Sequence, residues 1–297
     1  MLNGFFLVDK PRGMTSFEVV KELRKRLAFS KGLKPSSIKV GHSGTLDRLA
    51  TGLLIVGVGE GCKLLEFLIG CDKEYEVLAY FGAVSDTYDE DGKITPLKDL
   101  NKKNFDGILK KLPKIISENF LGEILQVPPK FSALKVQGRR ASDRARAGEE
   151  VNLSKREVTI FSFDLLDFTF PTASFRIKCS SGTYVRSLIH DLGQKLSCGA
   201  YVKELRRTMI DDFSVQDAVS LDNIDVQKIV SLEYVARHFQ FLTLNSDEFD
   251  LLRDGKILKN KKIEQGCFAM AFYENRLVGV LENADSGVKY RKVIHHD

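Results

Sequence analysis

The segment from Lys39 to Leu54 carries the side chains best suited to chemistry. It reads KVGHSGTLDRLATGLL, and its glycines at positions 41, 44 and 52 permit close approach of a ligand to the backbone. Asp47 stands among leucines, where a carboxylate has no evident role in folding. His42 lies in the same loop of small polar residues. We therefore interpret Asp47 as a functional carboxylate, with a loop or cap aspartate as the alternative.

Other patterns that suggest chemistry fail on spacing. The run GVGEG at 57–61 has its third glycine one residue early for a dinucleotide loop, and GCK at 61–63 does not complete a P-loop. The acidic run at 86–92 is out of register for a calcium-binding EF-hand. The five cysteines are scattered without a C-x-x-C pair, which argues against a zinc site or a disulfide framework. The sequence thus predicts no metal and no nucleotide cofactor.

Positive charge is concentrated in one segment of the chain. Residues 130–156 hold eight basic and three acidic residues, an excess equal to the net charge of +5 of the whole protein. Such a segment suits a polyanion, because phosphates that it neutralises release counterions, although a solvated charged face has the same composition. With no apolar run of membrane length, no export signal and unpaired cysteines, we expect a cytoplasmic protein that does not enter a membrane.

Hydrophobic periodicity predicts alternating strands and helices rather than a regular repeat of strand, helix and strand. The hydrophobic fraction of 43% is typical of a globular protein. Glycine-marked turns divide the last sixty residues into short strands, which predicts a small β-rich second domain. Strands are expected over 4–8, 53–56, 75–81, 156–170, 174–179, 268–273 and 277–281, and helices over 17–27, 101–118 and 184–196.

Besides the segment around Asp47, six segments in chain order resemble the motifs of one enzyme family. They read KPRGMTS at 10–16, KEY at 73–75, FGAVSDTYDEDG at 81–92, QVPPKFSALKVQG at 126–138, SGTYVRSL at 181–188 and LRRT at 205–208. Together with GHSGTLDRLATGLL at 41–54, they resemble the bacterial tRNA pseudouridine synthase B family, called TruB. The resemblance covers residues 5 to about 213, whereas the tail from about 240 is only weakly similar to the C-terminal PUA domain of that family.

The resemblance implies an α+β fold, with a mixed, largely antiparallel sheet and flanking helices, known as the pseudouridine synthase fold. It implies a catalytic domain at 1–238, with an RNA-clamping insertion at about 130–156, and a PUA-like domain at 239–297. The implied activity is the isomerisation of uridine to pseudouridine at position 55, in the T-loop of tRNA, after the base is flipped out. The reaction needs no cofactor or metal, and we expect a monomer that binds the T-arm of tRNA without an obligate protein partner.

The resemblance also implies roles for individual residues. Asp47 is expected to act as a nucleophile or as a base, and the residues do not choose between these paths. Arg186 is expected to hold Asp47 through a two-pronged contact, and Tyr75 to stack on the uracil. His42 is the candidate to fill the space that the flipped base leaves. Contacts to the RNA or the pocket wall are expected from Tyr184, Lys10, Lys63, Lys130, Lys135, Arg139, Arg140, Arg206 and Arg207.

Two departures from the family pattern lie next to Asp47. Arg48 replaces the proline of the signature, which frees one backbone angle and places a cation beside the carboxylate, and Ser43 replaces a threonine. Two other functions remain open. One is a non-catalytic RNA-binding or tRNA-folding protein on the same scaffold, which would be free to lose Asp47, Tyr75 or Arg186. The other is a guide-RNA-dependent synthase working in a ribonucleoprotein.

Overall fold

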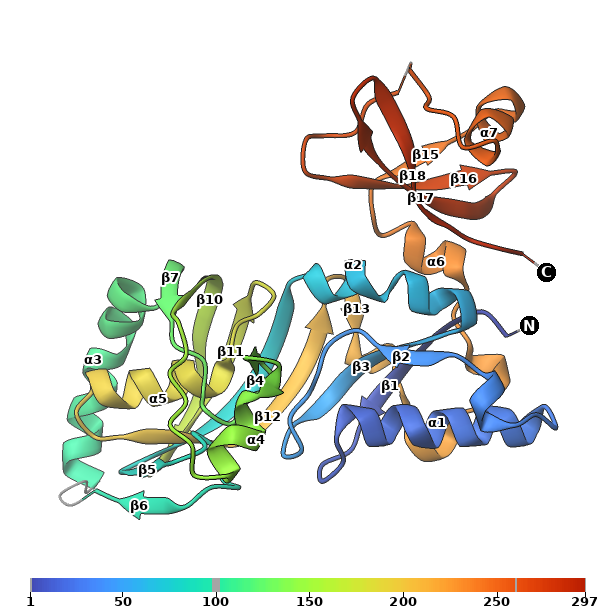
Figure 1. The fold of residues 1–297 in the computed structure, drawn as a ribbon. Helices are drawn as coiled ribbons and strands as arrows, with labels where there is room; N and C mark the ends of the chain where they lie inside the picture. Colours follow the sequence, from blue (N-terminus) through green and yellow to red (C-terminus); the bar gives the residue numbers. More distant parts are fainter. Residues whose placement is uncertain (1, 98–101, 260, 297) are drawn as a thin grey trace.

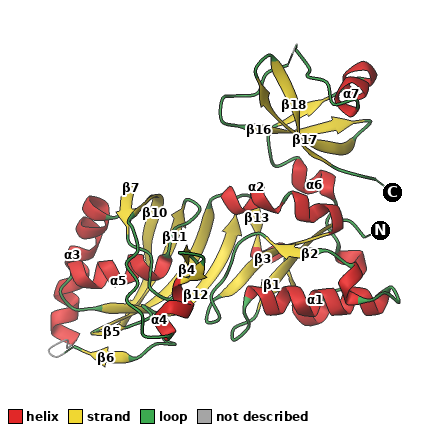
Figure 2. Cartoon of the chain, viewed as in Figure 1, coloured by secondary structure: helices red, strands yellow, loops and turns green. Residues whose placement is uncertain are grey.

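A ten-stranded sheet, a separate four-stranded sheet and seven α-helices make up the part of the chain that the computed structural model describes, residues 2–97, 102–259 and 261–296 (Figure 1). Helices pack along the large sheet, and the C-terminal sheet lies beside it (Figure 2). The strands of the large sheet are β1 (Gly4–Lys10), β2 (Val40–His42), β3 (Thr51–Val58), β4 (Lys73–Phe81), β7 (Gly122–Gln126), β10 (Arg156–Thr169), β11 (Thr172–Cys179), β12 (Ala200–Ile210), β13 (Phe213–Ser214) and β14 (Val219–Ser220).

The remaining elements are short hairpins, the C-terminal strands and the helices. The hairpins are β5 (Ala83–Ser85) with β6 (Ile94–Pro96) and β8 (Lys135–Val136) with β9 (Arg139–Arg140). The C-terminal sheet consists of β15 (Phe241–Thr243), β16 (Phe268–Tyr273), β17 (Arg276–Ala284) and β18 (Gly287–Val293). The α-helices are α1 (Ser16–Ser30), α2 (Leu65–Gly70), α3 (Lys102–Asn119), α4 (Ala141–Arg146), α5 (Val185–Lys195), α6 (Leu232–Ala236) and α7 (Ser246–Arg253).

Nearly all neighbouring strands of the large sheet run antiparallel, in the order β14-β1-β3-β12-β4-β11-β10-β7. Two contacts are parallel: the edge pair of β1 and β14, and the central pair of β3 and β12. The central pair is short, with Arg206 opposite Thr51 and Arg207 opposite Gly52. A Cβ on Gly52 would lie 2.3 Å from the carbonyl oxygen of Arg207, so only glycine allows this close approach. The sheet is therefore joined narrowly at its middle and opens beyond that point.

Two apolar cores lie on either side of this junction. Helix α1 begins with a capping box between Thr15 and Glu18 and buries Val19, Leu23 and Leu27 against β1 and β3, as the helical spacing predicts. Strand β4 alternates buried and half-buried residues along its whole length, and its buried face packs with α3 and α5. The predicted mixed, largely antiparallel sheet with flanking helices is confirmed.

The C-terminal sheet packs on two sides. On one side, a first set of apolar residues of the sheet, such as Val288, forms a core with Leu244 and with Leu252 of α7. A second set, including Met270 and Phe272, joins one core with Phe67 and Leu68 of α2. The predicted β-rich tail is thus present as a sheet, while the division at residue 238 remains a proposal, because this second core includes residues from both sides of it.

Most predicted elements are found within a few residues of their expected bounds. The structure also contains elements that the sequence analysis does not predict. The central strand β12 is one of these, and β18 and α7 of the tail are two others. Among the described residues, no helix combines the length and hydrophobicity needed to cross a membrane.

Candidate active site

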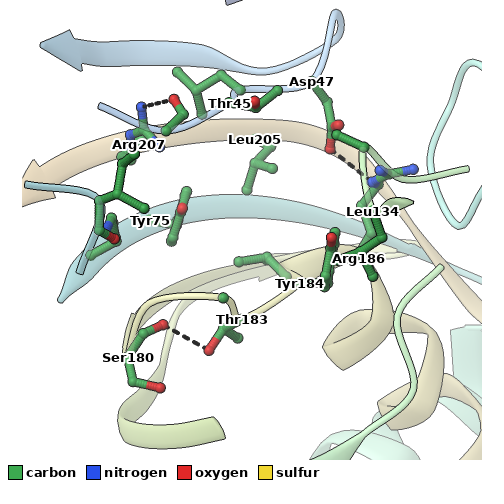
Figure 3. A pocket seen from close by; sticks show the side chains of 17 residues that line it. Thr45, Asp47, Tyr75, Leu134, Ser180, Thr183, Tyr184, Arg186, Leu205 and Arg207 are labelled. Carbon is green, nitrogen blue, oxygen red and sulfur yellow. Dashed lines mark hydrogen bonds and ion pairs between the residues drawn. The ribbon is translucent and has the colours of Figure 1, made fainter. Parts of the chain in front are cut away.

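A cavity of about 310 Å³ opens beside the narrow junction of β3 and β12. Figure 3 shows Asp47, Tyr75 and Arg186 facing this cavity from three different elements. Asp47 comes from the loop between β2 and β3, Tyr75 from β4, and Arg186 from the first turn of α5. The structure therefore brings together three residues that lie far apart in the sequence and that we expected to share one site.

Arg186 is the most connected side chain of the site, with 4% of its side chain exposed. Its Nε lies 2.9 Å from Oδ2 of Asp47, in an ion pair without hydrogen-bond geometry. One terminal nitrogen donates to Oδ2 of Asp89 at 3.0 Å and to the carbonyl oxygen of Thr87 at 2.9 Å. The other donates to the carbonyl oxygen of Phe131 at 2.9 Å. The expected two-pronged contact with Asp47 is therefore absent, because the two terminal nitrogens serve other partners.

The backbone on both sides of Asp47 is held by the start of α1. The hydroxyl of Ser16, which is 1% exposed, accepts a hydrogen bond from the Leu46 amide at 2.8 Å and donates to the Leu46 carbonyl at 3.3 Å. On the other side, the Gly13 amide donates to the Arg48 carbonyl at 2.8 Å. Asp47 keeps 39% of its side chain exposed, so a carboxylate on a fixed backbone stays accessible from the cavity.

The departure at Arg48 has a structural explanation. Its guanidinium lies 3.2 Å from Glu18, the residue that closes the capping box of α1. Arg48 thus pairs with another carboxylate than Asp47. An ion pair here ties the loop to the helix, at the position where the family pattern has a proline that restricts the backbone.

The floor of the cavity is built by β4 and β12. Lys73 and Tyr75 are two residues apart on β4 and therefore lie on the same face of the sheet. Tyr75 is 9% exposed, and burial raises the pKa of its hydroxyl. Arg207 of β12 lines the same cavity and donates to the carbonyl oxygens of Leu53 at 2.8 Å and Gly44 at 3.3 Å.

Tyr184 lies at the N-terminus of α5, two residues before Arg186, and also lines the cavity. Its backbone is held by the side chain of Gln126, which donates to the Tyr184 carbonyl at 3.0 Å and accepts from the Tyr184 amide at 2.8 Å. Gln126 is 1% exposed and lies at the end of β7. It therefore fixes the first turn of α5, which carries Arg186.

Several residues expected to contact RNA have other places in the structure. Lys10 is fully buried, and its ammonium donates to the carbonyl oxygens of Pro11 at 2.9 Å and Met14 at 2.6 Å, which leaves it no access to a phosphate. Lys63 pairs with Glu60 and donates to Val293 of the C-terminal sheet, away from the cavity. Arg207 is 1% exposed and donates to the backbone of Gly44 and Leu53, on either side of Asp47. The buried position of Lys10 corrects the expectation of an RNA contact there, whereas Arg207 forms part of the pocket wall.

Arg206 and His42 also lie outside the cavity lining. Arg206 alternates with Arg207 along β12, so it points to the opposite face of the sheet, where it forms a two-pronged pair with Asp9 at 2.7 and 3.0 Å. His42 is half-buried on β2, and one ring nitrogen accepts a hydrogen bond from the Gly44 amide at 3.3 Å. Burial lowers the pKa of this imidazole.

The basic segment from 130 to 156 forms the hairpin of β8 and β9 and helix α4. Lys130, Lys135, Arg139 and Arg140 are exposed, as an RNA-contacting surface requires. Glu149 pairs with Arg139 at 2.8 Å and with Arg144 at 2.7 Å, which fixes the shape of the segment. Arg146 lines a second hollow, next to Asp47 and Arg48. The segment therefore borders the active-site cavity.

Three positioning residues went unassigned in the sequence. Asp89 pairs with Arg186, Gln126 holds Tyr184, and Ser16 holds Leu46. Each belongs to a motif that carries the family resemblance. The available signal was their place in those motifs, whereas their partners could be identified only from the fold.

Comparison with known proteins places the chain in one family. The family model described as the N-terminal domain of TruB family pseudouridylate synthases matches residues 30–185, and the model of the tRNA pseudouridylate synthase B C-terminal domain matches residues 186–242. A curated protein of Aquifex aeolicus, named tRNA pseudouridine synthase B, is 37% identical over 95% of this chain and 96% of its own length. The protein of the same name from Clostridium tetani is 33% identical over 99% of this chain and 100% of its own length.

Solved structures share the fold. In a crystal structure of a Cbf5–Nop10–Gar1 complex, one chain aligns with a TM-score of 0.69 and 22% identity, covering 98% of this chain and 85% of that one. The archaeal box H/ACA Nop10–Cbf5 complex gives the same TM-score and identity, with coverage of 99% and 86%. At this identity the likeness concerns the fold alone. The sequence matches, together with the geometry around Asp47, establish that the chain belongs to the TruB family of pseudouridylate synthases.

Proposed function

We propose that this protein isomerises uridine to pseudouridine in the T-loop of tRNA, at position 55. The observation that carries the proposal is the accessible carboxylate of Asp47, held at the cavity beside the buried Arg186 and opposite Tyr75. Relatives of nearly the same length, over 30% identical, carry the name tRNA pseudouridine synthase B. A binding protein without catalysis would have no need for a connected set of buried charges around an exposed carboxylate.

The reaction breaks the bond between N1 and C1′, turns the base, and joins C5 to C1′. The proton on C5 is released and N1 gains one, so nothing is oxidised or added overall. Asp47 can act as a nucleophile on the ring or the sugar, or as a base that removes the C2′ proton, and both paths require it ionised. The guanidinium of Arg186 lies 2.9 Å from this carboxylate and orients it at the cavity.

The other residues around the cavity bind and orient the base. Tyr75 would stack on the uracil, because its ring lines the cavity floor opposite Asp47. Tyr184 would form a second aromatic wall, fixed by Gln126. Asp89 would keep the guanidinium of Arg186 in place by occupying one of its terminal nitrogens.

The RNA would approach over the basic segment. Its exposed lysines and arginines suit the phosphates of a T-arm, and the base must leave the stack to reach the cavity, which costs a few kcal/mol. His42 remains our candidate to fill the vacated space, from the end of β2, before the loop that leads to Asp47. We propose that the protein works as a cytoplasmic monomer without an obligate protein partner, and that residues 239–297 add affinity for tRNA.

Release of tritium from RNA labelled at C5 of uridine tests the proposal directly. The protein should release the label from a T-arm hairpin, and the Asp47→Asn variant should not. A hairpin with cytidine at the target position is the matched substrate control and should give no release. If the protein binds the hairpin without releasing tritium, it is an RNA-binding protein on this scaffold and the proposed activity is wrong.

A further inference from the structure

Helix α2 lies between the active-site cavity and the C-terminal sheet. Figure 1 shows it on the side of the large sheet that faces β15–β18, close to α6. It has only six residues, and so short a helix is not stable by itself in water. Its position therefore depends on what packs against it from both sides.

The C-terminal sheet contacts α2 through an aromatic pair and an ion pair. The rings of Phe67 and Phe268 have their centroids 4.2 Å apart, and Phe67 is 6% exposed. The guanidinium of Arg291 lies 5.1 Å from the centre of the Phe67 ring and pairs with Glu66. Phe67 and Leu68 share one apolar core with Met270 and Phe272 of the sheet. These contacts attach the helix to the C-terminal sheet.

The opposite end of α2 reaches the cavity. Ile69 lines it with 49% of its surface exposed, an apolar side chain open toward the site. Lys73 is 7% exposed and donates to the carbonyl oxygens of Ile69 at 2.6 Å and Leu68 at 3.4 Å, and to that of Cys71. Because Lys73 shares a face of β4 with Tyr75, the last turn of α2 is linked to the cavity floor.

We propose that the C-terminal sheet positions one wall of the active site. Phe268 contacts Phe67 and so holds α2, and α2 in turn places Ile69 and the carbonyl oxygens that bind Lys73. Phe268 touches no reacting atom and is a positioning residue that acts through α2. The inference rests on the proposed function for its kinetic test. It differs from the view of the tail as an RNA-affinity module, because it assigns the tail an effect on the rate with RNA already bound.

A pair of matched variants in the full-length protein separates these views. Phe268→Ala removes the ring that contacts Phe67. Phe249→Ala removes another half-buried ring, on α7, which stacks on Tyr273 of the same sheet at 4.4 Å instead. Single turnover at saturating T-arm RNA should be about tenfold slower for Phe268→Ala, because a small misplacement of the wall slows the reaction. Phe249→Ala should stay near the native rate, Phe268→Leu should recover most of the loss, and the Kd should change little in all three.

Hydrogen exchange without RNA gives a measurement that does not depend on activity. The Cys71 amide donates to the Leu68 carbonyl at 3.3 Å, and Phe268→Ala should accelerate its exchange while Phe249→Ala should not. A native rate in Phe268→Ala, equal losses in both variants, or a change in Kd alone would overturn the inference. Unchanged exchange at Cys71 would do the same. If the native protein itself releases no tritium, the proposed function fails, and the exchange experiment still decides whether the sheet holds α2.

Discussion

Arg186 and the arginines of the basic segment carry the same charge in opposite surroundings. Arg186 has 4% of its side chain exposed and contacts two carboxylates and two carbonyl oxygens. Arg139 and Arg146 have 60% and 71% exposed, and their partners are single surface carboxylates. The effect of a buried charge depends on the exact geometry of its partners, while exposed charges act mainly through how many there are and their sign. The first arrangement suits the reacting centre and the second suits a polyanion.

The largest expected effect on turnover is at Asp47, the carboxylate that pairs with the buried Arg186. Asp47→Asn keeps the size of the side chain but removes the nucleophile or base, so turnover should be lost. RNA binding should stay within about tenfold, or about 1.4 kcal/mol. Tritium release measures the first and filter binding the second. Multiple turnover by the purified variant would contradict the assignment of Asp47.

Arg186→Lys preserves the charge and changes only the geometry. A lysine cannot reach Asp47, Asp89 and Phe131 at once, because its ammonium is a single point rather than a planar fork. We expect the single-turnover rate to fall by about a hundredfold, with little change in Kd. Thermal unfolding should show a folded variant. A near-native rate would mean that charge alone suffices at this position.

Asp89→Asn tests whether the second carboxylate positions Arg186. The rate at neutral pH should fall by about tenfold, as for loss of one charged hydrogen bond. Burial raises the pKa of Asp89, while Arg186 opposes the shift. The native rate should therefore begin to fall, as pH decreases, above the ordinary aspartate range. In Asp89→Asn this acid limb should move to lower pH, and an unmoved limb would show that Asp89 does not contribute to it.

For the exposed arginines, RNA binding should depend on how many positive charges remain rather than on their exact geometry. Replacing Arg139, Arg140, Arg144 and Arg146 by Gln should weaken binding and reduce the slope of log K against log salt by up to about 3 units. The maximal rate should change little. Lys114→Gln on α3, with 76% of its side chain exposed, is the control for an exposed charge elsewhere. An unchanged slope in the quadruple variant would make the segment an ordinary solvated face.

The sequence predicts some of these residues and their surroundings better than others. The motifs identified Asp47, Tyr75 and Arg186, because chemistry restricts residue type and spacing within each motif. They could not distinguish buried from exposed cations. Lys10 is an example, since its fully buried ammonium donates to Met14 in the loop before α1 instead of facing RNA. The strand β12 was overlooked because its charged residues at 203–207 conceal the alternation of a strand.

In the tail, too, the sequence predicts local elements but not the partners against which they pack. The sequence predicts two of its four strands, β16 and β17, and Phe268 lies on the first of them. It could not show that this ring packs against Phe67, about two hundred positions earlier in the sequence. Contacts between segments that are distant in sequence arise from the fold as a whole. They leave no local periodicity that would identify the partner.

The smallest expected effect concerns Arg48, where an exposed charge lies next to the reacting centre. Arg48→Gln removes the pair with Glu18 but keeps the backbone bond from the Gly13 amide. Both side chains of the pair are about half exposed, so the loss of stability should be small and should disappear at high salt. The rate at low salt should fall by about twofold.

Glu18→Gln offers the matched test, because glutamine can still close the capping box of α1 while the ion pair is lost. It should reproduce the small effect of Arg48→Gln, and the double variant should lose no more than either single one, since both remove one interaction. Arg48→Pro should restore the low-salt rate by restricting the backbone directly. Additive losses in the double variant would show that Arg48 acts on Asp47 or on the RNA rather than through Glu18.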